Sequence, residues 1–129
     1  MVEFVHLHVH SQYSMLDSAL RLEAMVQRAK SLEMRALALT DHGNMFGALQ
    51  FHKACKNAGV APILGCEVNL CRDHRAQQGR DSQHLVLLAR SQEGYQNLVR
   101  LVSLGWVEGL VQGKPRIDFE QLQANRKGI

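Results

Sequence analysis

The amino-acid sequence predicts an α/β fold, because short strand-like segments alternate with segments of helical periodicity. The strand-like segments are apolar runs, and those between them repeat apolar residues every three or four positions. Ionisable side chains also stand where several strand-like runs end, the edge at which α/β sheets and barrels collect functional residues. We therefore expect βαβ units forming a sheet or a barrel.

Two strand-and-helix units are predicted in the first half of the chain. Residues 4–10 (FVHLHVH) have strand character, and residues 36–40 (ALALT) form the next strand. A second helix is expected over 45–58, with Gly59 as its left-handed stop. The first helix lies between the strands, and its apolar face is marked by Leu22, Met25, Val26, Ala29 and Leu32.

The second half continues the alternation. A third strand is expected over 60–68 (VAPILGCEV), an exposed polar loop over 72–83, and a strand over 84–89 (HLVLLA). Ser91 is expected to cap a helix around residues 94–106, and Asp118 a short helix over 119–126 after a GKP turn at 113–115.

The polar loop 72–83 also predicts a strand direction. It shows no clear crossover helix, whereas parallel neighbours need a connection of roughly a dozen or more residues, usually helical. We therefore expect 84–89 to run antiparallel to 60–68, which brings His84 beside Glu67.

Composition restricts the class of protein more than its function. The 129 residues, 46% of them apolar, suit one globular domain or part of a larger one. The net charge of +3 is spread along the chain and names no partner. Three cysteines without C-x-x-C spacing, no signal-like segment and no apolar run of roughly 20 residues predict a cytoplasmic protein with reduced thiols.

Three of the seven histidines, His6, His8 and His10, share one face of the first predicted strand. A single strand histidine is usually a hydrogen-bonded core residue, but several buried together are costly unless each finds a partner. A divalent cation satisfies several imidazoles at once. Imidazole with carboxylate suits Zn, Mn or Fe better than Mg or Ca. Further candidate ligands follow the predicted strands: Asp17, Asp41, His42 and Glu67.

Three segments together resemble the PHP (polymerase and histidinol phosphatase) domain family: FVHLHVHSQYSMLDS, ALTDHGNMFGALQFHKACKNAGVAPILGCEV and HLVLLARSQEGYQNLVRLVS. TDHGNMFGALQFHKACKNAG and GYQNLVRL are more specific than the H-x-H motif. They are similar to the branch at the amino end of bacterial DNA polymerase III alpha subunits. The resemblance implies a partial PHP-type (β/α)7 barrel in which residues 1–129 form the first half, as the amino-terminal part of a PHP domain.

The same resemblance implies a ligand set for two or three divalent ions, with Zn or Mn expected. The implied metal ligands are His8, His10, Asp17, His42, Glu67 and His84. A separation of more than roughly 10 Å between the side chains of Glu67 and His84 would remove His84 from this set, since metal bonds are only about 2 Å long. His6 is expected to be structural or a neighbour of the ligands, and Asp41 a neighbour that orients an imidazole. His52 and His74 are expected to be solvent-exposed. Three further ligands, usually Cys, Asp and His, are expected from later strands of the complete domain.

The activity implied by the resemblance is metal-dependent phosphoester hydrolysis within a replicative polymerase. The expected substrate is the primer 3′ end, giving 3′-5′ exonuclease proofreading, or pyrophosphate, and the expected partners are DNA and the other polymerase III subunits. The half barrel alone is expected to be inactive in hydrolysis and DNA synthesis. Its uncovered strand edges and apolar faces are expected to lead to association with another copy, partial disorder or marginal stability. Two alternatives remain: a metal-braced structural module without catalysis, and a stand-alone phosphatase of a small phosphate ester.

Overall fold

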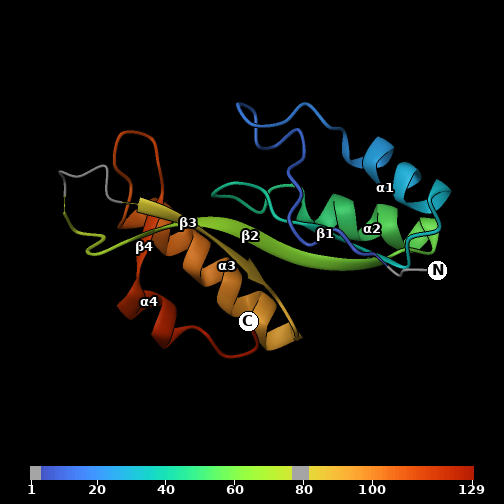
Figure 1. The fold of residues 1–129 in the computed structure, drawn as a ribbon. Helices are drawn as coiled ribbons and strands as arrows, with labels where there is room; N and C mark the ends of the chain where they lie inside the picture. Colours follow the sequence, from blue (N-terminus) through green and yellow to red (C-terminus); the bar gives the residue numbers. More distant parts are fainter. Residues whose placement is uncertain (1–3, 77–81) are drawn as a thin grey trace.

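The computed structural model describes residues 4–76 and 82–129, and these form the α/β arrangement that the sequence predicts (Figure 1). In chain order the elements are α1 (Leu22–Ser31), β1 (Ala36–Leu39), α2 (Ala48–Ala58), β2 (Ala61–Cys71), β3 (Ser82–Leu88), α3 (Gln92–Val107), β4 (Arg116–Asp118) and α4 (Phe119–Ala124). No helix in the described ranges is long and apolar enough to cross a membrane.

The long strand β2 joins the two halves of the molecule, with α1 and α2 toward one end and α3 and α4 toward the other (Figure 1). Its first part pairs in parallel with β1, from Ala36 opposite Ala61 to Leu39 opposite Leu64. Its second part pairs antiparallel with β3 and, over its last three residues, in parallel with β4. The antiparallel return predicted for residues 84–89 is therefore confirmed.

The predicted strand over residues 4–10 is only partly correct. This segment runs beside β1 but forms no regular ladder. Ala38 N–H donates to His6 O at 3.0 Å, and Thr40 N–H donates to Val9 O at 2.8 Å. The step from Ala38 to Thr40 spans two positions, whereas the step from His6 to Val9 spans three. The extra residue, next to His8, interrupts the regular pairing.

Local signals explain where several helices end or begin. Gly59 ends α2 in the left-handed region at φ 75°, where a glycine has no Cβ to clash. Ser91 Oγ accepts a hydrogen bond from Gly94 N–H at the start of α3. Asp118 and Gln121 form a reciprocal capping box at the start of α4. The predicted stops and caps at Gly59, Ser91 and Asp118 are confirmed.

Two apolar clusters form the core, one on each half of β2. The first packs α1, β1 and α2 together through Leu22, Met25, Val26, Ala29, Leu37, Leu39, Phe51, Cys55 and Val60. The second packs β2, β3, α3 and β4 through Cys66, Val68, Leu87, Leu98, Leu101 and Ile117. The predicted apolar face of the first helix is thus confirmed except at Leu32, which follows α1 and is 49% exposed.

The structure adds β4, which the sequence did not predict. It also extends β2 to Cys71, three residues beyond the predicted strand, and begins β3 at Ser82, within the predicted loop 72–83. Residues 77–81 of that loop lie outside the described part of the chain. β4 has only three residues, and Ile117 is its one apolar side chain, so no periodicity marks it. Its pairing with Asn69–Cys71 carries the chain back beside the middle of the sheet.

Candidate metal centre

Glu67, near the middle of β2, lies where four chain segments meet. Its backbone continues the pairing with β1 beyond the end of that strand. Glu67 N–H donates to Asp41 O at 3.0 Å, and Gly43 N–H donates to Glu67 O at 2.8 Å. His42 therefore forms an isolated parallel bridge with Glu67, and the two side chains stand beside each other. His42 Nδ1 lies 3.9 Å from Glu67 Oε1.

His84 reaches the same carboxylate from the opposite edge of β2. The antiparallel register sets Glu67 opposite Val86 and Asn69 opposite His84, so the side chains of Glu67, Asn69 and His84 share one face of the sheet. His84 Nδ1 lies 3.0 Å from Glu67 Oε1. This separation is well below roughly 10 Å, so His84 stays among the candidate ligands. The ring centroids of His42 and His84 are 4.5 Å apart.

His8 and His10 approach the other oxygen of Glu67 from the amino-terminal segment. His8 Nε2 is in direct contact with Glu67 Oε2, and His10 Nε2 lies 3.3 Å from the same oxygen. Their rings lie edge to face at 5.3 Å. His10 Nε2 is buried and has no hydrogen-bond partner among the described residues, which costs free energy unless a cation accepts its lone pair.

Asp17 belongs to a loop that Asp41 holds in place. Asp41 is 1% exposed and accepts hydrogen bonds from Ser11 N–H, Ser11 Oγ–H and Ser14 Oγ–H at 2.6 to 2.7 Å. Ser14 Oγ in turn accepts from His42 N–H at 3.0 Å. Asp41 is thus a neighbour of the candidate ligands, and it is linked to the His42 backbone through Ser14. The loop sets Asp17 Oδ2 at 3.1 Å from His42 Nδ1.

Asn69, which the sequence did not single out, fixes the state of the His42 ring. Asn69 Nδ2 donates to Pro115 O at 3.0 Å, and a carbonyl can only accept, so Asn69 Oδ1 faces His42 Nε2 at 3.0 Å. That oxygen can also only accept, so Nε2 carries the proton. In neutral His42 the lone pair is therefore on Nδ1, facing Asp17 and Glu67, where a proton or a metal ion can bind. The signal for Asn69 was its place two residues after Glu67 on one strand face.

Electrostatic coupling shifts the acids and the histidine in opposite directions. Burial tends to raise the pKa of Glu67, but the hydrogen bond with His8 and the charges of His10 and His84 bring it below its usual value. The hydrogen bond with His42 lowers the pKa of Asp17. Burial tends to lower the pKa of His42, yet its bonds to Asn69 and Asp17 raise it overall. The site thus stabilises ionised carboxylates surrounded by positive charge.

Two groups of three side chains fit a divalent ion, and they share Glu67. The ligand atoms of His8, His10 and Glu67 lie within 4.8 Å of one another, and so do those of His42, Glu67 and His84. A carboxylate that offers one oxygen to each group is suited to bridge two ions. Four imidazoles with carboxylates favour Zn or Mn over Mg or Ca. The buried, unpartnered His10 Nε2 agrees with this fit.

The other candidate histidines have different surroundings. The His6 ring packs against Phe4 at 4.7 Å, and His6 belongs to neither ligand group. His52 is half-buried on α2. The expectation that His74 is exposed is wrong: it is 3% exposed because Asp118 and Glu108, distant in sequence, contact its ring.

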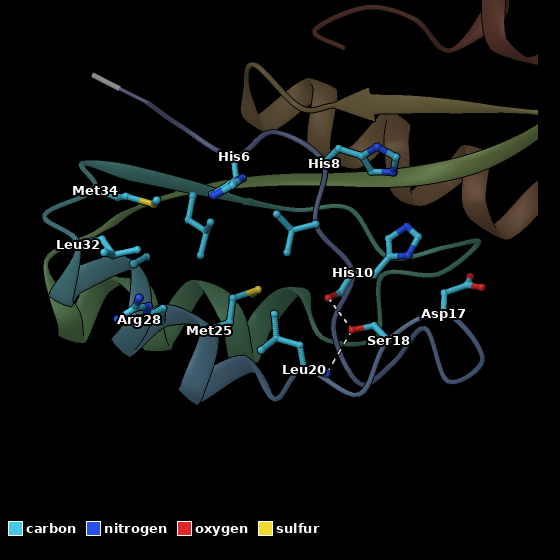
Figure 2. A pocket seen from close by; sticks show the side chains of 13 residues that line it. His6, His8, His10, Asp17, Ser18, Leu20, Met25, Arg28, Leu32 and Met34 are labelled. Carbon is cyan, nitrogen blue, oxygen red and sulfur yellow. Dashed lines mark hydrogen bonds between the residues drawn. The ribbon is translucent and has the colours of Figure 1, made fainter. Parts of the chain in front are cut away.

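A pocket of about 590 Å³ opens beside the metal centre (Figure 2). His8, His10 and Asp17 line one end, whereas Arg28 lies toward the other end, on α1 (Figure 2). The wall between them is largely apolar and includes Val9, Leu20, Met25, Ala29, Leu32 and Leu37. Ser18 Oγ–H donates to His10 O at 3.0 Å and so ties the loop to the histidine segment.

Comparison with known proteins gives consistent matches. Residues 6–129 match the PHP domain family. The chain is 47% identical over 133 residues to the DNA polymerase III subunit alpha of Treponema pallidum, covering 99% of this chain and 11% of that protein. It is 48% identical over 139 residues to the corresponding subunit of Deinococcus radiodurans, covering 98% of this chain and 10% of that protein. The chain thus spans about a tenth of the length of these curated relatives.

Two solved structures share the fold over 78% of this chain and 32% of their own, each with a TM-score of 0.57. One is an amidohydrolase from Chromobacterium violaceum with bound sulfate and no metal, at 27% identity. The other, at 19% identity, is a protein from Bifidobacterium adolescentis whose proposed activity is that of a metal-dependent phosphoesterase. The expectation of a partial PHP-type α/β fold is confirmed.

Proposed function

Since the chain belongs to the PHP domain family, we propose that its histidine and carboxylate cluster is a metal-dependent phosphoesterase centre. The proposed ligands are His8, His10, Asp17, His42, Glu67 and His84, and the proposed ions are Zn²⁺ or Mn²⁺. The observation that carries the proposal is Glu67, whose two oxygens each face a separate group of imidazoles. A side chain so placed is suited to hold two ions side by side.

Bound divalent ions would lower the pKa of a coordinated water toward neutrality and stabilise the charge on a phosphate group. The residues of the chain prepare for this in distinct ways. Asn69 keeps the proton of His42 on Nε2 and leaves Nδ1 free to bind. Asp41 fixes the loop that brings Asp17 to His42. Burial of Glu67 at 3% exposure keeps its carboxylate from competing contacts with water.

The pocket beside His8, His10 and Asp17 offers room for a phosphate ester next to the ligands (Figure 2). The relatives from Treponema pallidum and Deinococcus radiodurans are replicative polymerase subunits. We therefore propose a nucleic-acid 3′ end or pyrophosphate as the substrate, within a polymerase that works with other subunits in the cytoplasm. The same relatives argue against a stand-alone phosphatase of a small metabolite.

The test is hydrolysis by the full-length gene product. Purified protein loaded with Mn²⁺ or Zn²⁺ is expected to release nucleotides from a 3′-labelled primer, or phosphate from pyrophosphate. Removal of ions by a chelator should stop the reaction. His8→Ala should abolish it while circular dichroism shows an intact fold, and His52→Ala is the matched histidine control outside the ligand groups. Hydrolysis unaffected by His8→Ala would contradict the proposal.

A structural role for the ions is the second candidate, and one observation favours it. The proposed ligands come from five segments: residues 4–10, the loop that carries Asp17, the loop after β1, and the strands β2 and β3. Ions held between these segments would fasten them together. If this is the whole function, His8→Ala should lower the melting temperature of the metal-loaded protein, and neither substrate should be hydrolysed by the unaltered protein.

A further inference from the structure

A second group of potential ligands lies away from the Glu67 centre, between the end of β2 and the start of α4. Asp73 and His74 follow β2 in the chain, and Asp118 ends β4. The ligand atoms of these three side chains all lie within 4.8 Å of one another. His74 is 3% exposed and Asp118 is 6% exposed, whereas Asp73 is exposed.

Both ring nitrogens of His74 face carboxylate oxygens. Nδ1 contacts Asp118 Oδ2 directly, and Nε2 lies 3.5 Å from Glu108 Oε2, at the carboxyl end of α3. A neutral imidazole carries one proton, so it can donate toward only one of these oxygens. The other nitrogen then directs its lone pair at negative charge. A metal ion bound at that nitrogen would accept this lone pair and would also be attracted by the carboxylates.

The surroundings supply much negative charge and one buried positive charge. Three carboxylates, those of Asp73, Asp118 and Glu108, approach the ring. Arg116 is 4% exposed, but its guanidinium donates to backbone carbonyls, to Gly109 O at 3.3 Å and Ala76 O at 2.6 Å. Its role in these bonds is to hold the chain after β2 in place. Within residues 4–76 and 82–129 the acceptors of its hydrogen bonds are backbone carbonyls, and one guanidinium charge offsets only part of the charge of three carboxylates.

We propose that Asp73, His74 and Asp118 form a second divalent metal site, separate from the Glu67 centre. His74 binds through Nδ1, and Glu108 accepts the proton on Nε2, the carboxylate–imidazole–metal arrangement that orients ligating histidines. One imidazole with two carboxylates suits Zn²⁺ or Mn²⁺ better than Mg²⁺ or Ca²⁺. An ion here fastens the end of β2 to the start of α4 and serves as a structural clamp rather than a hydrolytic centre.

The experiment measures zinc binding to the full chain in a background whose first centre is disabled by Glu67→Gln together with His10→Ala and His42→Ala, so that each of its two ligand groups keeps a single imidazole and no carboxylate. Equilibrium dialysis against Zn²⁺ should retain one ion per chain that His74→Gln removes. Glu108→Gln should weaken the binding of that ion by about 10- to 100-fold, as expected when a ligating histidine loses the carboxylate that accepts its other ring proton. His52→Gln is the matched control and should leave binding unchanged. Zinc should also raise the melting temperature of the background protein but not of its His74→Gln form.

Asp73→Asn serves where His74→Gln prevents folding, because Asp73 is exposed and its loss leaves the His74–Asp118 contact in place. Asp73→Asn should weaken zinc binding by about tenfold or more, because losing a direct ligand costs at least as much affinity as losing a carboxylate that contacts the ligand from outside. Two results overturn the proposal: zinc retention that neither Asp73→Asn nor His74→Gln reduces, or nitrogen NMR showing that His74 keeps both ring protons at saturating zinc. The second result identifies the cation at the ring as a proton. The background lacks the first centre, so failure here is distinct from failure of the phosphoesterase proposal.

Discussion

Replacing Asn69 tests how the fold prepares His42 to bind an ion. Asn69→Leu removes the acceptor at 3.0 Å from His42 Nε2 and also the donor to Pro115 O. Asn69→Asp keeps an acceptor for His42 but loses the donor to Pro115. Both variants therefore lose the hydrogen bond to Pro115, and only Asn69→Leu loses the acceptor for His42. Comparing them separates control of the His42 proton from support of the sheet.

The expected size of the effect follows from the contacts. Loss of an outer partner of a metal-ligating histidine weakens metal binding by about 10- to 100-fold, or about 1.4 to 2.7 kcal/mol. Asn69→Leu should show this loss, whereas Asn69→Asp should bind as tightly as the unaltered chain or more tightly. Both should lose about 1–3 kcal/mol of folding stability, because the Pro115 carbonyl is left without its donor.

The assay is competition for Zn²⁺ against a chelator at fixed pH, together with nitrogen NMR of the metal-free chain. NMR should show His42 protonated on Nε2 in the unaltered protein. The reasoning is refuted if Asn69→Leu binds zinc as tightly as the unaltered chain, or if neutral His42 carries its proton on Nδ1. Equal weakening in both variants would assign Asn69 a purely structural role.

Three other substitutions or measurements address the surrounding site. Glu67→Gln should remove both ion-binding groups. The pKa of Glu67 is lowered from 4.5, so the folding stability that its ionised form contributes is present above that pH and is lost as the pH falls below it; urea titrations of the metal-free variant should therefore show a smaller loss of folding free energy in acid than those of the unaltered chain. Asp41→Ala should cost at least about 3 kcal/mol by urea denaturation and weaken metal binding through the Asp17 loop, and a stable variant with intact affinity would contradict that role. Burial raises the pKa of Cys66 to about 12, so a thiol reagent at pH 8 should label it only on unfolding, and rapid labelling of the native chain would show an open core.

The parts of the structure that the sequence predicted are those with local causes. Gly59 ends a helix, and Ser91 and Asp118 cap the first turn of the helices that follow them. These effects depend on a few neighbouring residues, so the sequence predicts them. The antiparallel return of β3 followed from the length and composition of one loop. The antiparallel return in turn predicted the contact between His84 and Glu67, although the two residues are 17 positions apart in the chain.

The parts that the sequence did not predict depend on contacts between distant segments. β4 is too short to show a period, and it is a strand only because residues 69–71 of β2 offer an open edge. His74 looked like a loop residue, and it is buried because Glu108 and Asp118 close around it. Residues 4–10 have strand character, yet the extra residue beside His8 prevents a regular ladder. Asn69 carries no charge and matches no motif, and its one sequence signal is its place two residues after Glu67, on the same face of β2.

The most direct measurement of the central claim is anomalous X-ray diffraction from crystals of the chain grown with Zn²⁺ or Mn²⁺. Anomalous peaks are expected within about 2 Å of the Glu67 carboxylate oxygens, with His8 and His10 ligating on one side and His42 and His84 on the other. Crystals that bind the ion elsewhere, with those four rings bonded only to protein or water, would contradict the claim.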